Sequence, residues 1–279
     1  MPINFCHIAP TAYLESVCSN QKYHLLLAHL VETDSNYVDY YNKLKSSVEG
    51  CAYIMDNAAF ELYSQGLPMF DSSKLISLAR KVGGVNYIVM SDYPGEPFTK
   101  TIQAAKELAP QFREQGFGTF FCPQSEIGDL EGLLTSYEFA ANSPLVDYIG
   151  VSILAIPNAY RISKDNKLQR FLSRWSFMSL LEERGILQQI VANGKKLHFL
   201  GMLDGPKEIS LVKPYHNYIS SWDSSAAVWL GVNKRSFDIS PTGLMQGKFE
   251  EPVDFDKALD LEGLPFIEDN KAFIDKLCV

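Results

Sequence analysis

The sequence lacks paired cysteines and any long apolar run. Its five cysteines are an odd number, widely spaced, and none stands near a cysteine or histidine at the spacing of metal ligands. This pattern predicts reduced thiols and argues against a disulfide framework or a metal site. No run approaches the roughly 20 apolar residues that cross a bilayer, and no signal peptide is evident. We therefore expect a cytoplasmic protein with no membrane partner.

Positive charge is also scarce. The chain has 33 acidic residues against 25 basic ones, which gives a formal net charge of −8. Such a chain has no general attraction for nucleic acid, so a nucleic-acid partner would need a local cluster of Lys and Arg. The length of 279 residues and the hydrophobic content of 46% suit a folded chain, either one α/β barrel or two smaller domains.

Short apolar runs alternate with longer amphipathic stretches along the chain. The runs predict seven strands, at 24–30, 52–56, 86–92, 118–124, 147–153, 197–203 and 215–222, with a weak eighth at 236–240. Helices are predicted at 35–47, 71–82, 98–115, 126–141, 167–193, 205–213 and 223–230. This alternation is typical of a (β/α)₈ barrel. Because no composition shift marks a boundary, we predict one domain over 1–279, with 248–279 as a tail packed on the barrel.

Polar residues follow most of the predicted strands. In a (β/α)₈ barrel the carboxyl ends of the strands form the active site, so these residues should converge. They are His29, Asp56, Asp92, Gln124, Ser152, the segment Met202 to Asp204, and Asp223. Carboxylates that converge shift one another's pKa values and favour a cationic or donor-rich ligand. Asp56 and Asp223 are the candidate catalytic residues, and His29 is expected only to line the pocket.

Three of these acidic residues also suit simpler roles. Asp56 is placed to form an Asx turn after its strand. Asp223 is a good N-cap for the helix that follows it, and Asp92 stands before a Tyr-Pro-Gly turn. The sequence alone leaves these alternatives open.

Six short segments follow one another in an order that a known family shares. They are 55–61, 87–92, 120–124, 149–152, 199–208 and 219–224. Together they resemble the tRNA-guanine transglycosylase family, in which each segment ends a barrel strand. The resemblance implies that Asp223 is a nucleophile, that Asp56 transfers a proton, and that Asp92 and Gln124 hold a base. Further pocket residues implied are Asn57, Phe60, Gly150, Ser152, Gly201 and Met202.

Departures from the family pattern narrow what the resemblance implies. The Cys-rich zinc site of the tRNA-acting members is missing, Ala58 and Ala59 replace paired glycines, and Glu61 replaces an amide. These changes look like those of the short, zinc-less bacteriophage relatives, which would place the protein in the cytoplasm of a host cell. The implied function is exchange of guanine in DNA for a 7-deazaguanine through an aspartyl-deoxyribose intermediate, without a cofactor. The DNA would present a flipped or single-stranded base. The oligomeric state stays open.

A basic cluster gives the implied DNA partner a contact surface. Tyr160, Arg161, Lys164 and Lys167 form a candidate phosphate track, which Lys234 and Arg235 would extend. The simpler interpretation of this cluster, including Arg174, is a solvated helix face. Two alternative functions are an N-glycosidase or transglycosylase acting on nucleosides or a modified pyrimidine, and a 7-deazaguanine-binding barrel without turnover.

Overall fold

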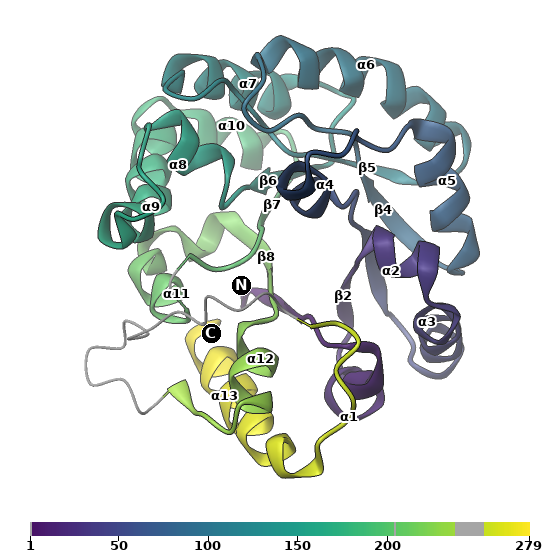
Figure 1. Cartoon of the computed structure of the whole chain (residues 1–279). Helices are drawn as coiled ribbons and strands as arrows, with labels where there is room; N and C mark the ends of the chain where they lie inside the picture. The colour runs from purple at the N-terminus through teal and green to yellow at the C-terminus, as the bar shows by residue number, and fades with distance from the viewer. Residues whose placement is uncertain (1, 204, 238–253) are drawn as a thin grey trace.

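Eight parallel strands form the centre of the molecule. The computed structural model describes residues 2–203, 205–237 and 254–279. The strands are β1 (Asn4–His7), β2 (Tyr23–Leu26), β3 (Ala52–Met55), β4 (Val85–Val89), β5 (Gly118–Phe121), β6 (Tyr148–Val151), β7 (Lys196–Phe199) and β8 (Ile219–Ser224). Hydrogen bonding links them in the order β1-β8-β7-β6-β5-β4-β3-β2. Helices surround the strands (Figure 1). The predicted single-domain (β/α)₈ barrel is confirmed, with a nearly closed sheet.

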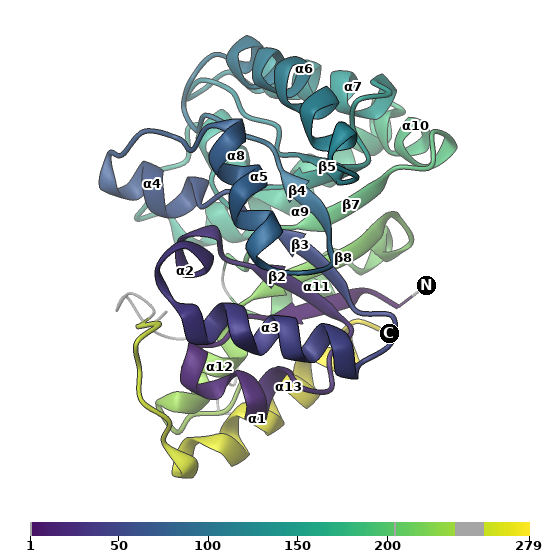
Figure 2. The same ribbon diagram turned by 90° about the vertical axis from the view of Figure 1, so that its right-hand side faces the viewer.

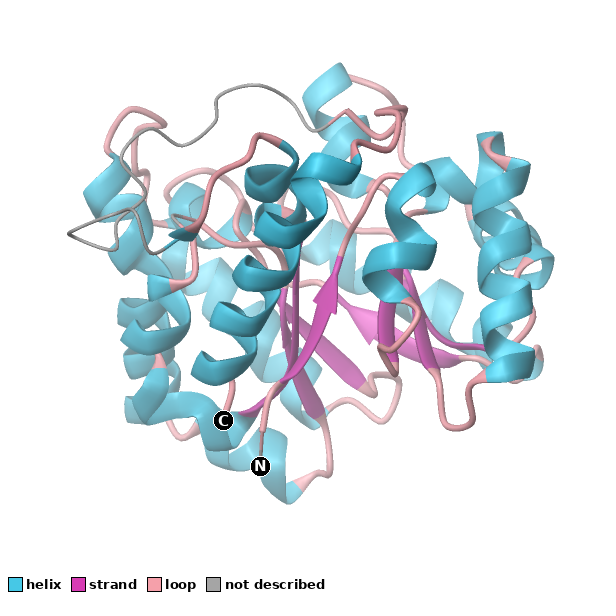
Figure 3. Cartoon of the chain, turned by 90° about the horizontal axis from the view of Figure 1, so that it is seen from below, coloured by secondary structure: helices cyan, strands magenta, loops and turns pink. Residues whose placement is uncertain are grey.

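Helices cover the outside of the sheet. They are α3 (Ser35–Ser47), α5 (Ser72–Lys81), α6 (Phe98–Glu114), α7 (Leu130–Asn142), α9 (Lys167–Glu183), α10 (Ile186–Ala192), α12 (Ala226–Val232) and α13 (Leu264–Leu277). Several begin where a polar side chain accepts backbone N–H bonds, as Asp34 does for α3 and Asp129 for α7. Seen from below, the strands lie in the middle with helices on both sides (Figure 3).

The other helices before β8 also lie in the connections between strands. They are α1 (Leu14–Cys18), α2 (Ala28–Thr33), α4 (Ala59–Gln65), α8 (Ala155–Ala159) and α11 (Lys207–Leu211), with 3-10 turns η1 (Thr11–Tyr13), η2 (Lys213–Tyr218) and η4 (Leu261–Gly263). Figure 2 shows α4 projecting from the side of the barrel opposite the two chain ends. This is the side on which the strands end, where the polar residues of the site lie.

The barrel has two apolar layers. Inside the sheet, six strand side chains and Cys122, which directly follows β5, pack together: Cys6, Leu25, Ile54, Val89, Phe120, Cys122 and Tyr148. A larger core lies between the sheet and the helices. All five cysteines are buried and unpaired, in agreement with the prediction of reduced thiols. In the described part of the chain, no helix is both long and apolar enough to cross a membrane.

Several element predictions need correction. The first strand, β1, was not predicted, and the predicted strand 24–30 ends at Leu26, because α2 begins at Ala28. The predicted helix 167–193 is two helices, since Gly185 adopts a left-handed conformation with φ 73°. The weak strand at 236–240 falls mostly on residues outside the described ranges, as do residues 248–253 of the predicted tail.

The last helix packs closely on the barrel. The α13 helix lies against α12, and a Cβ added at Gly231 would stand 2.5 Å from the Ile267 backbone nitrogen, so only glycine fits there. The Ile3 N–H donates to the Cys278 carbonyl at 2.8 Å, which holds the end of α13 beside the start of β1.

Candidate active site at the carboxyl ends of the strands

A tight turn after β3 positions Asp56. The Asp56 N–H continues the ladder by donating to the Leu26 carbonyl at 2.8 Å, and its Oδ2 accepts the Ala58 N–H at 3.1 Å. Ala58 has φ 60°, a left-handed conformation that disfavours a residue with a Cβ. The Asx turn considered for Asp56 is therefore present. It occupies one carboxylate oxygen, and among the described residues Oδ1 has no hydrogen-bond partner.

Two side-chain amides hold Asp92 beside this turn. Asn57 Nδ2 donates to Asp92 Oδ1 at 2.6 Å, and Gln124 Nε2 donates to Asp92 Oδ2 at 2.5 Å. Asn57 also donates to the Met90 carbonyl, which fixes its orientation. The structure thus connects residues that follow β3, β4 and β5. Asp92 makes these side-chain contacts in addition to preceding the Tyr-Pro-Gly turn. Gln124 Oε1 is buried and has no partner in the described chain.

Burial changes the acidity of both carboxyl groups. Asp92 is only 3% exposed, and burial raises its pKa to about 6 although the Asn57 and Gln124 hydrogen bonds lower it. The pKa of Asp56 is raised well above its usual value, first by burial and then by the negative charge of Glu61. Asp223 and Asp92 act on the Asp56 pKa in the same direction. Asp56, Asp92 and Asp223 therefore lie near one another, as the strand-end argument predicts, with Glu61 of α4 beside Asp56.

A buried histidine orients Asp223 on the opposite wall. His198 Nε2 donates to Asp223 Oδ1 at 2.9 Å, and His198 Nδ1 is 2.8 Å from Ser221 Oγ. The Gly201 N–H also donates to Asp223 Oδ1, at 3.2 Å. Asp223 makes no N-cap hydrogen bond to α12, so the capping alternative is wrong. His198 was not among the predicted site residues, although its inward position in β7 is the signal that could have identified it.

An ion pair is buried behind β7 and β8. Arg174 and Glu208 are both fully buried, with two hydrogen bonds of 2.6 Å between guanidinium and carboxylate. Arg174 also donates to the carbonyls of Val151, Leu200 and Gly201. Its placement on a solvated helix face is therefore wrong. The pair holds the segment after β7, whose Gly201 N–H contacts Asp223.

The other predicted pocket residues have varied surroundings. Ser152 Oγ accepts the N–H groups of Leu154 and Ala155 at the start of α8. A Cβ added at Gly150 would stand 2.9 Å from Phe120, so packing alone already requires glycine. The His29 ring lies 5.7 Å from the ring of Phe255. Phe60, on α4, is 51% exposed, and Met202 is buried. Asp204 lies outside the described ranges.

Some residues of the predicted phosphate track make contacts within the protein. Lys234 forms ion pairs with Asp260, at 3.6 Å, and with Glu262. Tyr160 Oη lies 3.5 Å from Ser176 Oγ, and the Tyr160 ring is partly buried against the core. Arg161, Lys164 and Lys167 are exposed around the start of α9.

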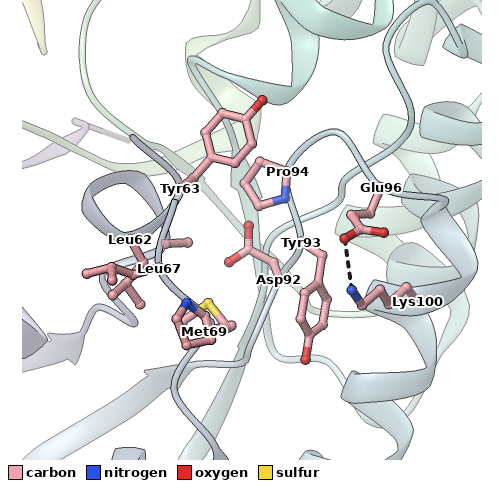
Figure 4. Close-up of a pocket in the computed structure, with 11 residues that line it drawn as sticks. Leu62, Tyr63, Leu67, Met69, Asp92, Tyr93, Pro94, Glu96 and Lys100 are labelled. Carbon is pink, nitrogen blue, oxygen red and sulfur yellow. Dashed lines mark hydrogen bonds and ion pairs between the residues drawn. The ribbon is translucent and has the colours of Figure 1, made fainter. Parts of the chain in front are cut away.

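A pocket of about 330 Å³ adjoins this site. It lies between α4 with the segment after it and the segment 92–96. In Figure 4 the Asp92 carboxylate stands between Leu62 and Met69 on one side and Tyr93 and Pro94 on the other. No group of three or more His, Cys, Asp or Glu side chains within the described ranges is arranged to hold a metal ion.

Comparisons with known proteins give only structural similarity. No protein-family model and no curated protein matches this chain. A HpcH/Hpal aldolase/citrate lyase family protein from Burkholderia cenocepacia J2315 has a TM-score of 0.53 and 10% identity, covering 84% of this chain and 91% of its own. A citrate lyase from Burkholderia xenovorans LB400 has a TM-score of 0.51 and 12% identity, covering 81% and 74%. At these identities the likeness shows the fold alone.

The resemblance to tRNA-guanine transglycosylases is therefore wrong. Similar structures with TM-scores above 0.5 include a HpcH/Hpal aldolase/citrate lyase family protein and a citrate lyase, and no family model or curated protein links this chain to tRNA-guanine transglycosylases. Base exchange in DNA, the 7-deazaguanine ligand and the transferase class are withdrawn with it, as are the two alternative functions. The physical reason is that polar residues end the strands of many barrel enzymes, so short segments in strand order reflect the fold.

Proposed function

We propose that this protein is an enzyme in which Asp56 transfers a proton to or from a small substrate at the mouth of the barrel. The observation that carries this proposal is the position of the Asp56 carboxyl group at the end of β3, near Glu61, Asp223 and Asp92, where burial and these charges raise its pKa. A carboxyl group whose pKa lies closer to neutrality both gives and accepts protons efficiently. The Oδ1 atom, unpartnered among the described residues, is the atom that would exchange the proton.

The remaining polar groups of the site have separate proposed roles. Asp223 is fixed by His198 and the Gly201 N–H, which makes it a second, rigidly oriented carboxylate. Asp92 is fixed by two amides and would bind a donor group of the substrate. Because Gln124 Oε1 is buried without a described partner, it offers a further acceptor to a ligand.

The charge of the site indicates the class of substrate. None of Asp56, Glu61 and Asp92 forms an ion pair with Lys or Arg in the described ranges, and Asp223 pairs only with His198. A cluster of unneutralised carboxylates attracts cations and N–H or O–H donors. We therefore propose an amine- or hydroxyl-bearing substrate. Two similar barrels are named for citrate lyase chemistry, and a lyase that moves a proton as a carbon bond breaks is the reaction class we propose first.

Deuterium incorporation from D₂O tests this function directly. Small amines, amino acids and hydroxy acids would be incubated with the protein, and exchange at carbon would be followed by NMR and mass spectrometry. We expect Asp56→Asn to slow exchange by about 10²–10⁴-fold, the usual contribution of a general acid–base group. Asp269→Asn changes an exposed carboxylate on α13 and serves as the matched control.

A direct titration separates the role of Asp56 from that of the substrate. The pKa of the Asp56 carboxyl, measured by ¹³C NMR, should lie well above the usual value of 3.8. Equal exchange rates for the native protein and Asp56→Asn, with any substrate that the native protein turns over, would eliminate Asp56 as the proton-transfer group.

A further inference from the structure

We propose that the substrate carries an apolar tail, which lies in the pocket between α4 and the segment 92–96, with its cationic amino group at Asp92. This inference rests on the proposed function and specifies its substrate class. The wall of the pocket is the observation that carries it. Leu62, Leu67, Pro68 and Met69 form one side, and the Tyr93 ring and Pro94 form the other.

The size and lining of the pocket fit a small organic group. Its volume of about 330 Å³ lies at the lower end of small-molecule sites, which are mostly apolar with a few fixed polar groups. Leu67 is 51% exposed and Tyr63 is 44% exposed, so apolar surface that a tail would cover faces solvent. Removal of such surface from water would favour binding.

Asp92 is the one lining carboxylate in this pocket without a cationic partner. The other acidic lining residue, Glu96, pairs with Lys100 at 2.9 Å, and Lys100 Nζ lies 4.3 Å from the centre of the Tyr93 ring. Those two charges compensate each other at the rim. Asp92 accepts one amide hydrogen bond on each oxygen and also contacts the Cys122 thiol, and a carboxylate has about four acceptor sites in all, so that capacity for a further donor remains. An ammonium group on the substrate supplies both the missing charge and the donors.

Tyr63, on the α4 side of the pocket, comes close to Gly95 in the opposite wall. A Cβ at Gly95, which has φ 78°, would lie 3.5 Å from Tyr63 Oη, so the α4 side chain reaches across to the opposite segment. The tail would enter from the barrel mouth and lie below this contact. The reacting part of the substrate then stays near Asp56, which belongs to the turn that begins α4.

Binding of three matched probes tests the inference. Phenethylamine has the ring and the ammonium group, ethylamine lacks the ring, and phenylacetate replaces the ammonium by a carboxylate. Protein labelled at the methionine methyl groups would be titrated at pH 7.5 and followed by NMR, because Met69 lines the pocket whereas Met178 is fully buried elsewhere. We expect phenethylamine to shift the Met69 signal and to bind about tenfold more tightly than ethylamine, since the ring is buried.

Two variants assign the binding energy to the two ends of the probe. Leu67→Gln should reduce the advantage of phenethylamine over ethylamine severalfold, whereas Leu261→Gln, at an exposed leucine outside the pocket, should leave it unchanged. Asp92→Asn should remove the preference for phenethylamine over phenylacetate. Because Leu67 is exposed, its substitution is not expected to prevent folding.

The outcomes distinguish this inference from the proposed function. If ethylamine binds as tightly as phenethylamine, or if the Met69 signal does not move, the apolar pocket is not a tail site, and proton transfer by Asp56 still stands on the exchange experiment. If phenylacetate binds as tightly as phenethylamine, Asp92 does not select a cation and the inference is overturned. If the native protein catalyses no deuterium exchange with the compounds named above, that result would instead count against the proposed function.

Discussion

Charged groups on the two sides of the barrel mouth have different kinds of partners. Behind β7 and β8, the fully buried Arg174 has Glu208 and three backbone carbonyls as partners, and Glu208 also accepts the Leu203 N–H. After β3 and β4, Asp56 and Asp92 are held by amide, backbone and thiol groups, with no described cationic partner. The charges on the first side are compensated within the protein, whereas those on the second side have no compensating charge among the described residues.

This difference separates charges that support the fold from charges that are available for chemistry. A buried ion pair with every donor and acceptor satisfied is a fixed part of the structure. A buried carboxylate with a raised pKa and no counter-charge lowers stability, and such groups cluster at functional sites. Three tests follow from this contrast, from the largest expected effect to the smallest.

Substitution of Arg174 should have the largest effect. Arg174→Met would leave Glu208 as an uncompensated buried charge and would remove the donors to Val151, Leu200 and Gly201. We expect the free energy of unfolding in urea to fall by about 3–5 kcal/mol. A loss below about 1 kcal/mol, the range of surface pairs, would show that the two sides do not differ as described.

Substitution of Asp92 should have the opposite sign at neutral pH. The folded-state pKa of about 6 lies above the usual value of 3.8, so the folded protein binds the proton more tightly than the unfolded chain does. Stability contributed by this group is therefore fully present below about pH 4 and is lost as the pH rises through about 6. Asp92→Asn abolishes this loss, so at pH 7.5 we expect it to raise the free energy of unfolding by about 1–3 kcal/mol.

The pH dependence provides the control for the Asp92 substitution. At pH 4 the native carboxyl is largely protonated, so Asp92→Asn should change stability little, provided that the Gln124 amide turns to present its oxygen. Urea unfolding at pH 4 and pH 7.5 gives both values. A destabilisation of the same size at both pH values would indicate that the hydrogen bonds to Asn57 and Gln124, rather than the charge, determine the effect.

An exposed ion pair should have the smallest effect. Arg184 donates to Glu131 at 2.9 Å, and the two side chains are 45% and 72% exposed. Arg184→Met should change the free energy of unfolding by no more than about 1 kcal/mol, because water screens and solvates both charges. Urea unfolding of Arg184→Met and Arg174→Met under the same conditions compares their free energies of unfolding. It tests whether burial, and not the Arg–Glu pairing itself, sets the size of the effect.

Much of the barrel was predictable because local patterns set it. The helix 35–47 was predicted with the bounds of α3, and the strand-end positions of Asp56, Asp92 and Asp223 follow from the fold. By contrast, β1 is short and carries Asn4 and His7, so it has no apolar run, and its place depends on pairing with β8. A sequence window contains no information about a partner so far along the chain.

The undetected site residues have a similar explanation. His198 lies in a correctly predicted strand region, but its role depends on the register that places β7 beside β8. Arg174 lies in a helix whose charged residues predict a solvated face from the sequence. Its burial depends on pairing with Glu208, which lies on α11. Short motifs also misled the family assignment, since they describe where strands end and not which reaction follows.

The position of β1 has a consequence for synthesis of the chain. In the sheet order β1 stands beside β8, and Asn4 Nδ2 donates to the Ser220 carbonyl, 216 residues away. At about 5–20 residues per second, a ribosome would need about 10–40 s to produce β8 after β1 has emerged. Throughout that interval β1 lacks its hydrogen-bonded partner, so a nascent chain of this protein must keep an unpaired edge from aggregating until β8 arrives.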